Sequence, residues 1–154
     1  MNSKTSTVSK ALNFFEQGYA CSQSVLLAFA DNFNLDLKSA KLVSSTFGGG
    51  MGRLREKCGA VTGSFMVIGL AMGNEYPQDM ERKLYSYRKV RELDKKVKEL
   101  YGTVNCGEII RKHASEADIQ DRKHHKIICR KVISDTVGIL WDMLNDYEIE
   151  TTPK

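Results

Sequence analysis

Apolar residues recur every three or four positions along almost the whole chain, and this spacing restricts the possible folds more than any other feature of the sequence. Between residues 78 and 101 they form a single stripe, made of Met80, Leu84, Tyr87, Val90, Leu93, Val97 and Leu100. A stripe with this spacing is typical of an amphipathic helix. No segment alternates apolar and polar residues for long enough to predict a β-strand. The sequence therefore predicts an all-α protein.

The same spacing, together with capping signals, predicts where the helices lie. Asp36 is a good N-cap, and Gly18 and Gly102 are typical helix ends. The expected helices cover residues 5–17, 21–32, 37–47, 60–73 and 78–101, a short segment from about Asn105, and a final segment of about 120–146. No linker, repeat or low-complexity segment divides the 154 residues. We therefore expect a single domain over residues 1–154, folded as a bundle of about six or seven helices.

Composition and charge argue against several classes of protein. The longest apolar stretch, residues 60–73, is shorter than the ~20 residues of a membrane span and predicts a buried central helix. The first residues contain no apolar segment of the kind found in secretory signals. A net charge of +4, without any motif that reads nucleic acid, argues against a nucleic-acid partner. We therefore expect a cytoplasmic protein with no membrane span.

Two of the four cysteines are expected at the starts of helices. Cys58 follows a basic loop that contains Arg53 and Arg55, and Cys106 follows Asn105, a good N-cap. The partial positive charge of a helix N-terminus and nearby cations both favour a thiolate, so they would lower the pKa of a thiol from its usual value of ~8.5. If no metal is bound, Cys58 and Cys106 are therefore the predicted redox thiols.

The other two cysteines are expected on inward faces of their helices. Cys21 shares a helical face with Val25 and Phe29, and Cys129 begins an apolar stripe that continues through Ile133. A buried free cysteine often acts only as a small hydrophobic side chain. If separate helices converge, however, one thiol from each could ligate a single metal centre. No two of the cysteines form a CxxC pair, so such a site would have to be assembled by tertiary structure.

Glycines lie on both sides of Cys58 in the sequence, at residues 48–52 before it and at Gly59 and Gly63 after it. Gly59 and Gly63 share a helical face, with Ala60 beside them. Glycine inside a helix costs about 0.5–1 kcal/mol relative to alanine, so the close approach of a cofactor or of another helix should offset that cost. We predict cofactor contacts for Gly59, Ala60 and Gly63, with tight helix packing as the alternative. The glycine-rich residues 48–52 form a turn or a lid, and they lack the GK[ST] ending of a phosphate loop.

The histidines are weaker candidates for a metal site. His125 precedes Cys129 by four residues and His113 follows Cys106 by seven, so each could share a helical face with its cysteine. The segment that includes His124 and His125 is better explained as a charged, exposed helix start. We therefore expect a ligand set made of cysteines alone.

The chain resembles the family of redox-active four-cysteine proteins named for the pattern C_GCAxxG_C_C. The resemblance covers about residues 15–135 and is carried by four segments in order: GYACSQSVLLAF around Cys21, CGAVTG from Cys58, NCGEII around Cys106 and ICRKVI around Cys129. It implies a helical protein with redox-active cysteines. The family is also similar to the helical, cluster-carrying part of split-Soret cytochromes c, which implies an iron–sulfur centre. The haem half of that comparison does not carry over, because the chain has no CxxCH motif.

The sequence leaves three hypotheses open. In the first, a metal centre, either an iron–sulfur cluster or a structural zinc ion, is held by Cys21, Cys58, Cys106 and Cys129. In the second, no metal is bound, Cys58 attacks a disulfide and another cysteine resolves the product. In the third, the cysteines only pack inside a helical scaffold. The sequence does not identify the electron donor or acceptor, any substrate or any enzymatic activity. It also leaves open whether the protein is a monomer or a homo-oligomer.

Overall fold

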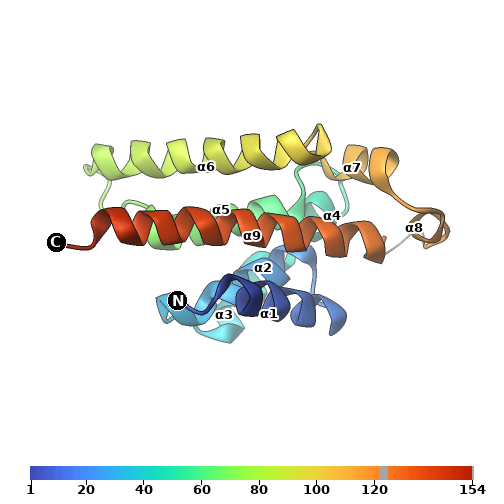
Figure 1. Cartoon of the computed structure of the whole chain (residues 1–154), viewed down its shortest axis with the longest axis horizontal. Coiled ribbons are helices and arrows are strands. Elements are labelled where there is room, and N and C mark those ends of the chain that lie inside the picture. The colour runs from blue at the N-terminus through green and yellow to red at the C-terminus, as the bar shows by residue number, and fades with distance from the viewer. Residues whose placement is uncertain (122–124, 154) are drawn as a thin grey trace.

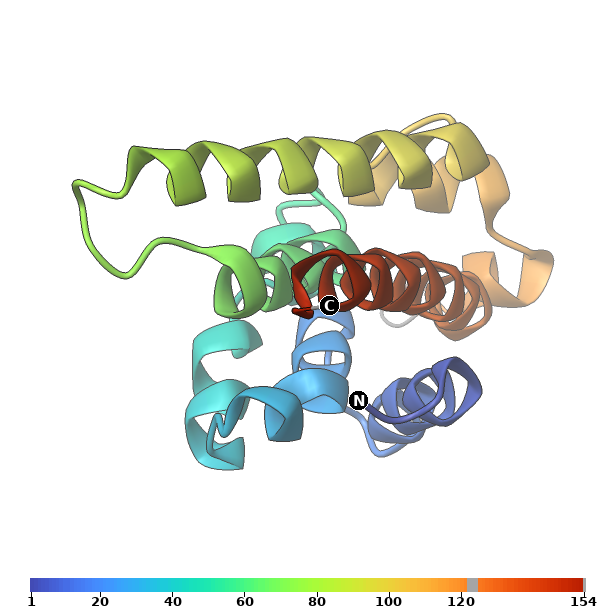
Figure 2. The same ribbon diagram turned by 60° about the vertical axis from the view of Figure 1, so that its left-hand side comes forward.

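The helices of the chain are stacked in three layers. A computed structural model describes residues 1–121 and 125–153. Its helices, in chain order, are α1 (Lys4–Glu16), α2 (Cys21–Phe29), the short 3-10 helix η1 (Ala30–Phe33), α3 (Leu37–Ser45), α4 (Gly48–Met51), α5 (Gly59–Met72), α6 (Met80–Tyr101), α7 (Cys106–His113), α8 (Glu116–Gln120) and α9 (Lys126–Thr151). α5 and α9 form the middle layer, with α6 on one side of it and α1, α2 and α3 on the other (Figure 1 and Figure 2).

The all-α class predicted from the periodicity is confirmed. Seven of the helices in the described residues are at least eight residues long, in agreement with the expected six or seven. The two remaining α-helices, α4 and α8, are about one turn each. Asp36 caps α3 as predicted, by accepting a hydrogen bond from the Ser39 N–H at 2.8 Å. Strand-like pairing in residues 1–121 and 125–153 is limited to one isolated bridge between Lys57 and Asn105.

α5 lies at the centre of the molecule because it is apolar on nearly every side. Ala60, Val61, Val67 and Ile68 are fully buried, and α5 packs against α2, α6 and α9. A helix that is hydrophobic all round is stable in water only when other elements surround it. The prediction of a buried central helix in this part of the chain is therefore confirmed.

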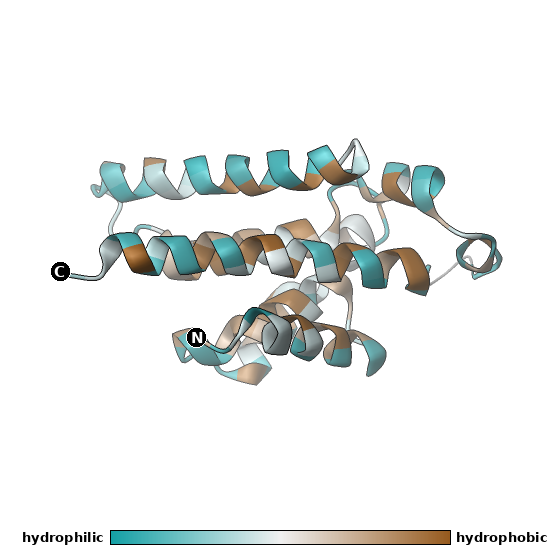
Figure 3. Cartoon of the chain, viewed as in Figure 1, coloured by the Kyte–Doolittle hydropathy of each residue, from teal (hydrophilic) through white to brown (hydrophobic). Residues whose placement is uncertain are grey.

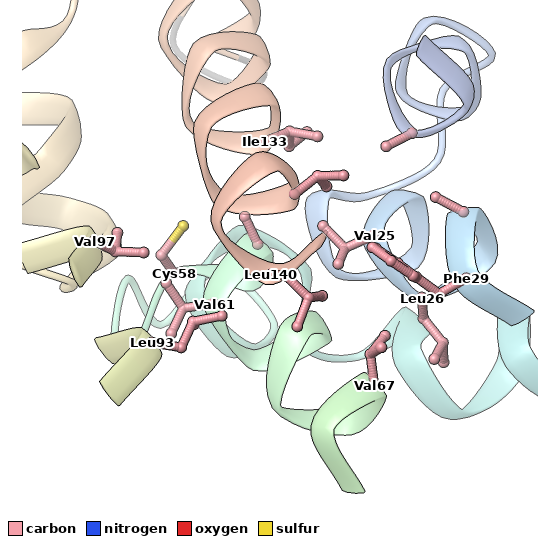
Figure 4. Packing of buried hydrophobic residues seen from close by; sticks show 14 of the residues in the cluster. Val25, Leu26, Phe29, Cys58, Val61, Val67, Leu93, Val97, Ile133 and Leu140 are labelled. Carbon is pink, nitrogen blue, oxygen red and sulfur yellow. The ribbon is translucent and has the colours of Figure 1, made fainter. Parts of the chain in front are cut away.

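One cluster of buried side chains joins the layers. Figure 4 shows part of it, with Phe29 of α2, Leu93 of α6 and Leu140 of α9 among its members, and Cys58 belongs to the same cluster. The outer face of α6, by contrast, is mainly hydrophilic (Figure 3). None of the helices in the described residues combines the length and the hydropathy that a membrane span requires.

The start of α9 is set by the carboxylate of Asp118, in the preceding helix α8. This carboxylate accepts hydrogen bonds from the N–H groups of Ile127 (2.8 Å) and Ile128 (3.1 Å). It also accepts hydrogen bonds from the N–H and the hydroxyl of Ser115. The last helix consequently begins at Lys126, later than the sequence predicts, because α8 forms a separate turn before it.

Candidate redox site

Four helices begin around one region of the molecule, and each carries a cysteine in its first turn. Cys58 is the N-cap of α5, and Cys21 and Cys106 are the first residues of α2 and α7. Cys129 lies in the first turn of α9. The first turn of a helix presents unpaired N–H groups and partial positive charge. The start of α9 differs from the others, because the Asp118 carboxylate accepts hydrogen bonds from two of its N–H groups.

All four cysteines line one cavity of about 490 Å³. Each comes from a different helix, so the cavity is assembled by tertiary packing and not by a local motif. Gly59 and Ala60, two of the three residues predicted to contact a cofactor, line the same cavity. The structure therefore brings together every cysteine that the sequence singled out.

The backbone holds the starts of α5 and α7 side by side. The Cys58 N–H donates a hydrogen bond to the carbonyl oxygen of Val104 (2.8 Å), and the Cys106 N–H donates one to the carbonyl oxygen of Glu56 (2.5 Å). Asn105 caps α7 as predicted, by accepting a hydrogen bond from the Glu108 N–H at 3.0 Å. These contacts place Cys58 and Cys106 together without any help from their side chains.

The glycine-rich segment before Cys58 is a tight left-handed turn packed against Cys106. A Cβ built on Gly50, whose φ is 69°, would lie 2.5 Å from the Cβ of Cys106 and 2.9 Å from the Cα of Arg55. Only glycine can adopt this φ and leave this space free. The φ angle is positive at every residue from Gly49 to Arg53, including two that are not glycine.

Gly63, the third predicted cofactor contact, does not line the cavity. A Cβ built on it would lie 2.7 Å from the carbonyl oxygen of Ser22 and 3.1 Å from the Cα of Ser22, both in α2. The absence of a side chain therefore lets α5 and α2 approach each other closely. Packing, the alternative to a cofactor contact, explains this glycine.

Burial has a larger effect on the pKa of Cys58 and Cys106 than the helix start has. Burial raises the pKa of Cys58 to about 12, although the N–H groups of Ala60 and Val61 act to lower it. Burial also raises the pKa of Cys106, and the hydrogen bond from Arg55 Nη1 to its sulfur (3.7 Å) offsets only part of this effect. The lowered pKa predicted for these two thiols is therefore wrong for the free thiols.

Cys21 and Cys129 interact with each other on the wall of the same cavity. This interaction and burial both raise the pKa of Cys21. The same interaction lowers the pKa of Cys129 despite its burial, and the positive charge of Arg55 adds to that effect. The surroundings of Cys129 therefore favour its thiolate, which the sequence did not predict.

Each of the two described histidines uses one ring nitrogen in a hydrogen bond to the backbone. His125 Nδ1 lies 2.9 Å from the carbonyl oxygen of Asp118, and His113 Nε2 lies 2.8 Å from the carbonyl oxygen of Tyr101. His125 is buried, so the prediction that it is exposed is wrong, while His124 lies outside the described residues. As the side chains lie here, no group of three or more His, Cys, Asp or Glu in the described residues is arranged to hold a metal ion.

α2 begins at Cys21, as the expected helix over residues 21–32 does, but sequence reasoning assigned only Cys58 and Cys106 to helix starts. Ala20, the residue before Cys21, has no side-chain acceptor and is a poor N-cap. Gln23 compensates from within the helix, since its Oε1 accepts a hydrogen bond from the Ala20 N–H at 2.9 Å. A Gln at the third position of a helix is half of a capping box, and it is the signal that could have identified Cys21 as a helix-start cysteine.

Comparison with known proteins agrees with the arrangement of the cysteines. A family model described as "Putative redox-active protein (C_GCAxxG_C_C)" matches residues 19–143. No curated protein and no solved structure matches the chain. The matched region contains all four cysteines and the four helix starts that carry them. The chain therefore belongs to the C_GCAxxG_C_C family.

Proposed function

We propose that Cys21, Cys58, Cys106 and Cys129 hold an iron–sulfur cluster in the cavity, and that the protein transfers or senses electrons at this site. The observation that supports the proposal is that cysteines from four separate helices line one cavity. Four thiolates are the usual ligand set of iron–sulfur clusters, and such a cluster supplies electron-transfer chemistry when it is bound.

The surroundings of the cavity suit a set of thiolates. The helix starts that carry Cys21, Cys58 and Cys106 contribute partial positive charge, which favours the negative charge that ligation requires. The Arg55 guanidinium donates to the sulfur of Cys106, and the N–H groups of Ala60 and Val61 lie next to the sulfur of Cys58. Hydrogen bonds of this kind adjust the reduction potential of a cluster. Because burial raises the pKa of Cys58 and Cys106, metal binding would release protons from these thiols.

A structural zinc site would use the same four ligands and is the alternative among metals. Zinc carries out no redox chemistry, whereas the family is described as redox-active. The similarity to the helical part of split-Soret cytochromes c stays a prediction from the sequence, and it also favours iron. The iron–sulfur cluster is therefore the form of the metal centre that we propose.

The metal proposal is tested by purifying the protein without oxygen and measuring its absorption spectrum, iron and zinc on one sample. We expect iron with visible thiolate-to-iron absorption, and near-complete loss of both in Cys58→Ser, because a cluster that loses one of four ligands is poorly held. Thr136→Val is the control, since it only replaces a buried hydroxyl that has no hydrogen-bond partner within the described residues. A colourless protein without iron, or equal iron in Cys58→Ser, would contradict the proposal.

A second candidate function is metal-free thiol–disulfide exchange, and the interaction between Cys21 and Cys129 on the cavity wall favours it. The Cys129 thiolate would attack one sulfur of a small-molecule disulfide and expel the other sulfur as a thiolate. Cys21 would then lose its proton and attack the sulfur of Cys129, which expels the second thiolate. The protein dithiol is oxidised to a disulfide and the substrate is reduced to two thiols. The attacking thiol is thus Cys129, in place of the Cys58 expected from the sequence.

Mild oxidation followed by peptide mapping without reduction tests this candidate. We expect the accessible thiols to fall by two and the disulfide to join Cys21 to Cys129. Cys129→Ser should abolish the change, and Cys58→Ser should preserve it because burial keeps the Cys58 thiol protonated. A disulfide that contains Cys58 would show that the pair is assigned wrongly.

A further inference from the structure

The cavity of the four cysteines is lined by cations and, within the described residues, by no carboxylate. Arg53, Arg55 and Lys126 contribute to its wall, together with apolar side chains such as Phe15 and Ile110. No Asp or Glu is among the lining residues in the described part of the chain. Apart from the cysteines, the charged side chains that a ligand meets in this cavity are therefore positive.

These three cations have no acidic partners within the described residues. Every ion pair there is formed by other lysines and arginines. The contact that Arg55 makes is with the sulfur of Cys106, and Arg53 and Lys126 are exposed. Asp118 on α8, whose charge acts on Cys129, already accepts hydrogen bonds from the start of α9. Guanidinium groups without a carboxylate beside a cavity are suited to binding an anion from solution.

The loop that carries the two arginines has an unusual backbone. Arg53 and Arg55 have φ angles of 65° and 59°, in the left-handed region that residues other than glycine rarely adopt. The turn that contains them is held by the hydrogen bond from the Glu56 N–H to the carbonyl oxygen of Gly50 (3.0 Å). Strained backbone of this kind is concentrated at functional sites, where it places a side chain that a relaxed loop would not place.

The size of the cavity limits the kind of anion. A volume of about 490 Å³ lies within the range of sites for small molecules, roughly 300–1,000 Å³. Its wall combines apolar side chains with a few polar groups, which is typical of sites for small organic ligands. A macromolecular anion such as nucleic acid would need a long positive surface, and the cations here are gathered at one cavity.

We propose that the mouth of this cavity binds a small organic anion, with a carboxylate or phosphate group held by Arg53, Arg55 and Lys126. The inference goes beyond the redox proposal, because the binding of the anion requires only these cations and not a metal centre or a disulfide. Bound there, the anion lies on the same cavity as the four sulfurs. One further step rests on the proposed redox function: the molecule that exchanges electrons with the cysteines is then a small anion.

Titration calorimetry in a low-salt buffer, free of phosphate and carboxylate, tests the proposal with two probes, tricarballylate and inorganic pyrophosphate. We expect at least one of them to bind, and the stronger one identifies the preferred anionic group. The double variant Arg53→Gln and Lys126→Gln should weaken that binding by about tenfold, because it removes two charge-assisted contacts. Both side chains are exposed, so the variant should fold like the wild type.

The matched control is the double variant Arg91→Gln and Lys95→Gln on α6. It removes the same two types of charge from exposed residues that form no ion pair in the described part of the chain and do not line the cavity. Its affinity for the probes should equal that of the wild type. The proposal would be overturned by equal weakening in both double variants, by unchanged affinity in Arg53→Gln/Lys126→Gln, or by no binding of either probe.

Iron content and thiol count are measured on the same samples. Both quantities should equal those of the wild type when only the anion site is lost, so the anion proposal and the redox proposal can fail separately.

Discussion

Gly63→Ala is expected to lower the free energy of unfolding by about 2–3 kcal/mol, a large effect for the addition of one methyl group. The new Cβ would lie 2.7 Å from the carbonyl oxygen of Ser22 and 3.2 Å from the Cβ of Val25. The first of these atoms belongs to the backbone of α2, so the contact cannot be relieved by a change of rotamer. α2 and α5 must instead move apart, and the buried cluster between them loses contacts.

Gly69→Ala in the same helix is the matched control for this prediction. A Cβ built on Gly69 meets no atom within 4 Å, and this residue is exposed. Alanine there should raise the free energy of unfolding by about 0.5–1 kcal/mol, because it only removes the entropic cost of glycine in a helix. Denaturation by urea, followed by circular dichroism, measures both changes. If Gly63→Ala proves as stable as Gly69→Ala, α2 and α5 are farther apart than described.

The replacement Asp118→Ala is expected to lower the free energy of unfolding by about 2–3 kcal/mol, since it removes a cap and leaves the buried N–H group of Ile128 unpaired. Asp118 is 2% exposed, and its carboxylate accepts hydrogen bonds from Ile127 and Ile128. Asp36→Ala is the control, because Asp36 is an exposed cap of one N–H on α3, and its loss should cost less. Thermal unfolding of both variants gives the comparison. Equal losses would show that burial of the α9 cap adds nothing.

The contribution of Asp118 should also depend on pH. Burial acts to raise the pKa of this carboxyl, but the hydrogen bonds from Ser115, Ile127 and Ile128 outweigh burial and lower it. A carboxyl whose pKa is lower in the folded state stabilises the fold fully above its unfolded pKa of ~3.9, and this stabilisation is lost as the pH falls through the folded value. The difference between the wild type and Asp118→Ala should therefore be constant near neutral pH and shrink below about pH 4. A difference that grows in acid would contradict the assigned contacts.

Features that depend on nearby residues could be predicted from the sequence. The apolar composition of residues 60–73 predicts the buried helix α5, and Asp36 and Asn105 cap α3 and α7 as expected. These features follow from local spacing and from side chains within one helical turn. The cysteines gather at one cavity because helices that are distant in the sequence pack together. The spacing of residues along the chain does not show which helices pack together.

The errors share a cause, which is that tertiary contacts outweigh local preferences. The helix start near Cys58 does act to lower its pKa, but desolvation by the surrounding core is the larger effect. The role of Gly63 depends on Ser22, a residue on another helix. The beginning of α9 depends on the Asp118 carboxylate from the preceding helix. None of these partners can be identified without knowing which helices lie together.

The order of the cysteines along the chain has a consequence for biosynthesis. Cys129 lies on α9, which also forms half of the middle layer, and the three other cysteines precede it. A ribosome must therefore release most of the chain before the last sulfur can reach the cavity. Until then the site lacks one of its four sulfurs, so a cofactor held by all four cysteines is complete only after α9 has been translated. Loading of the cavity would then report that the whole bundle has folded.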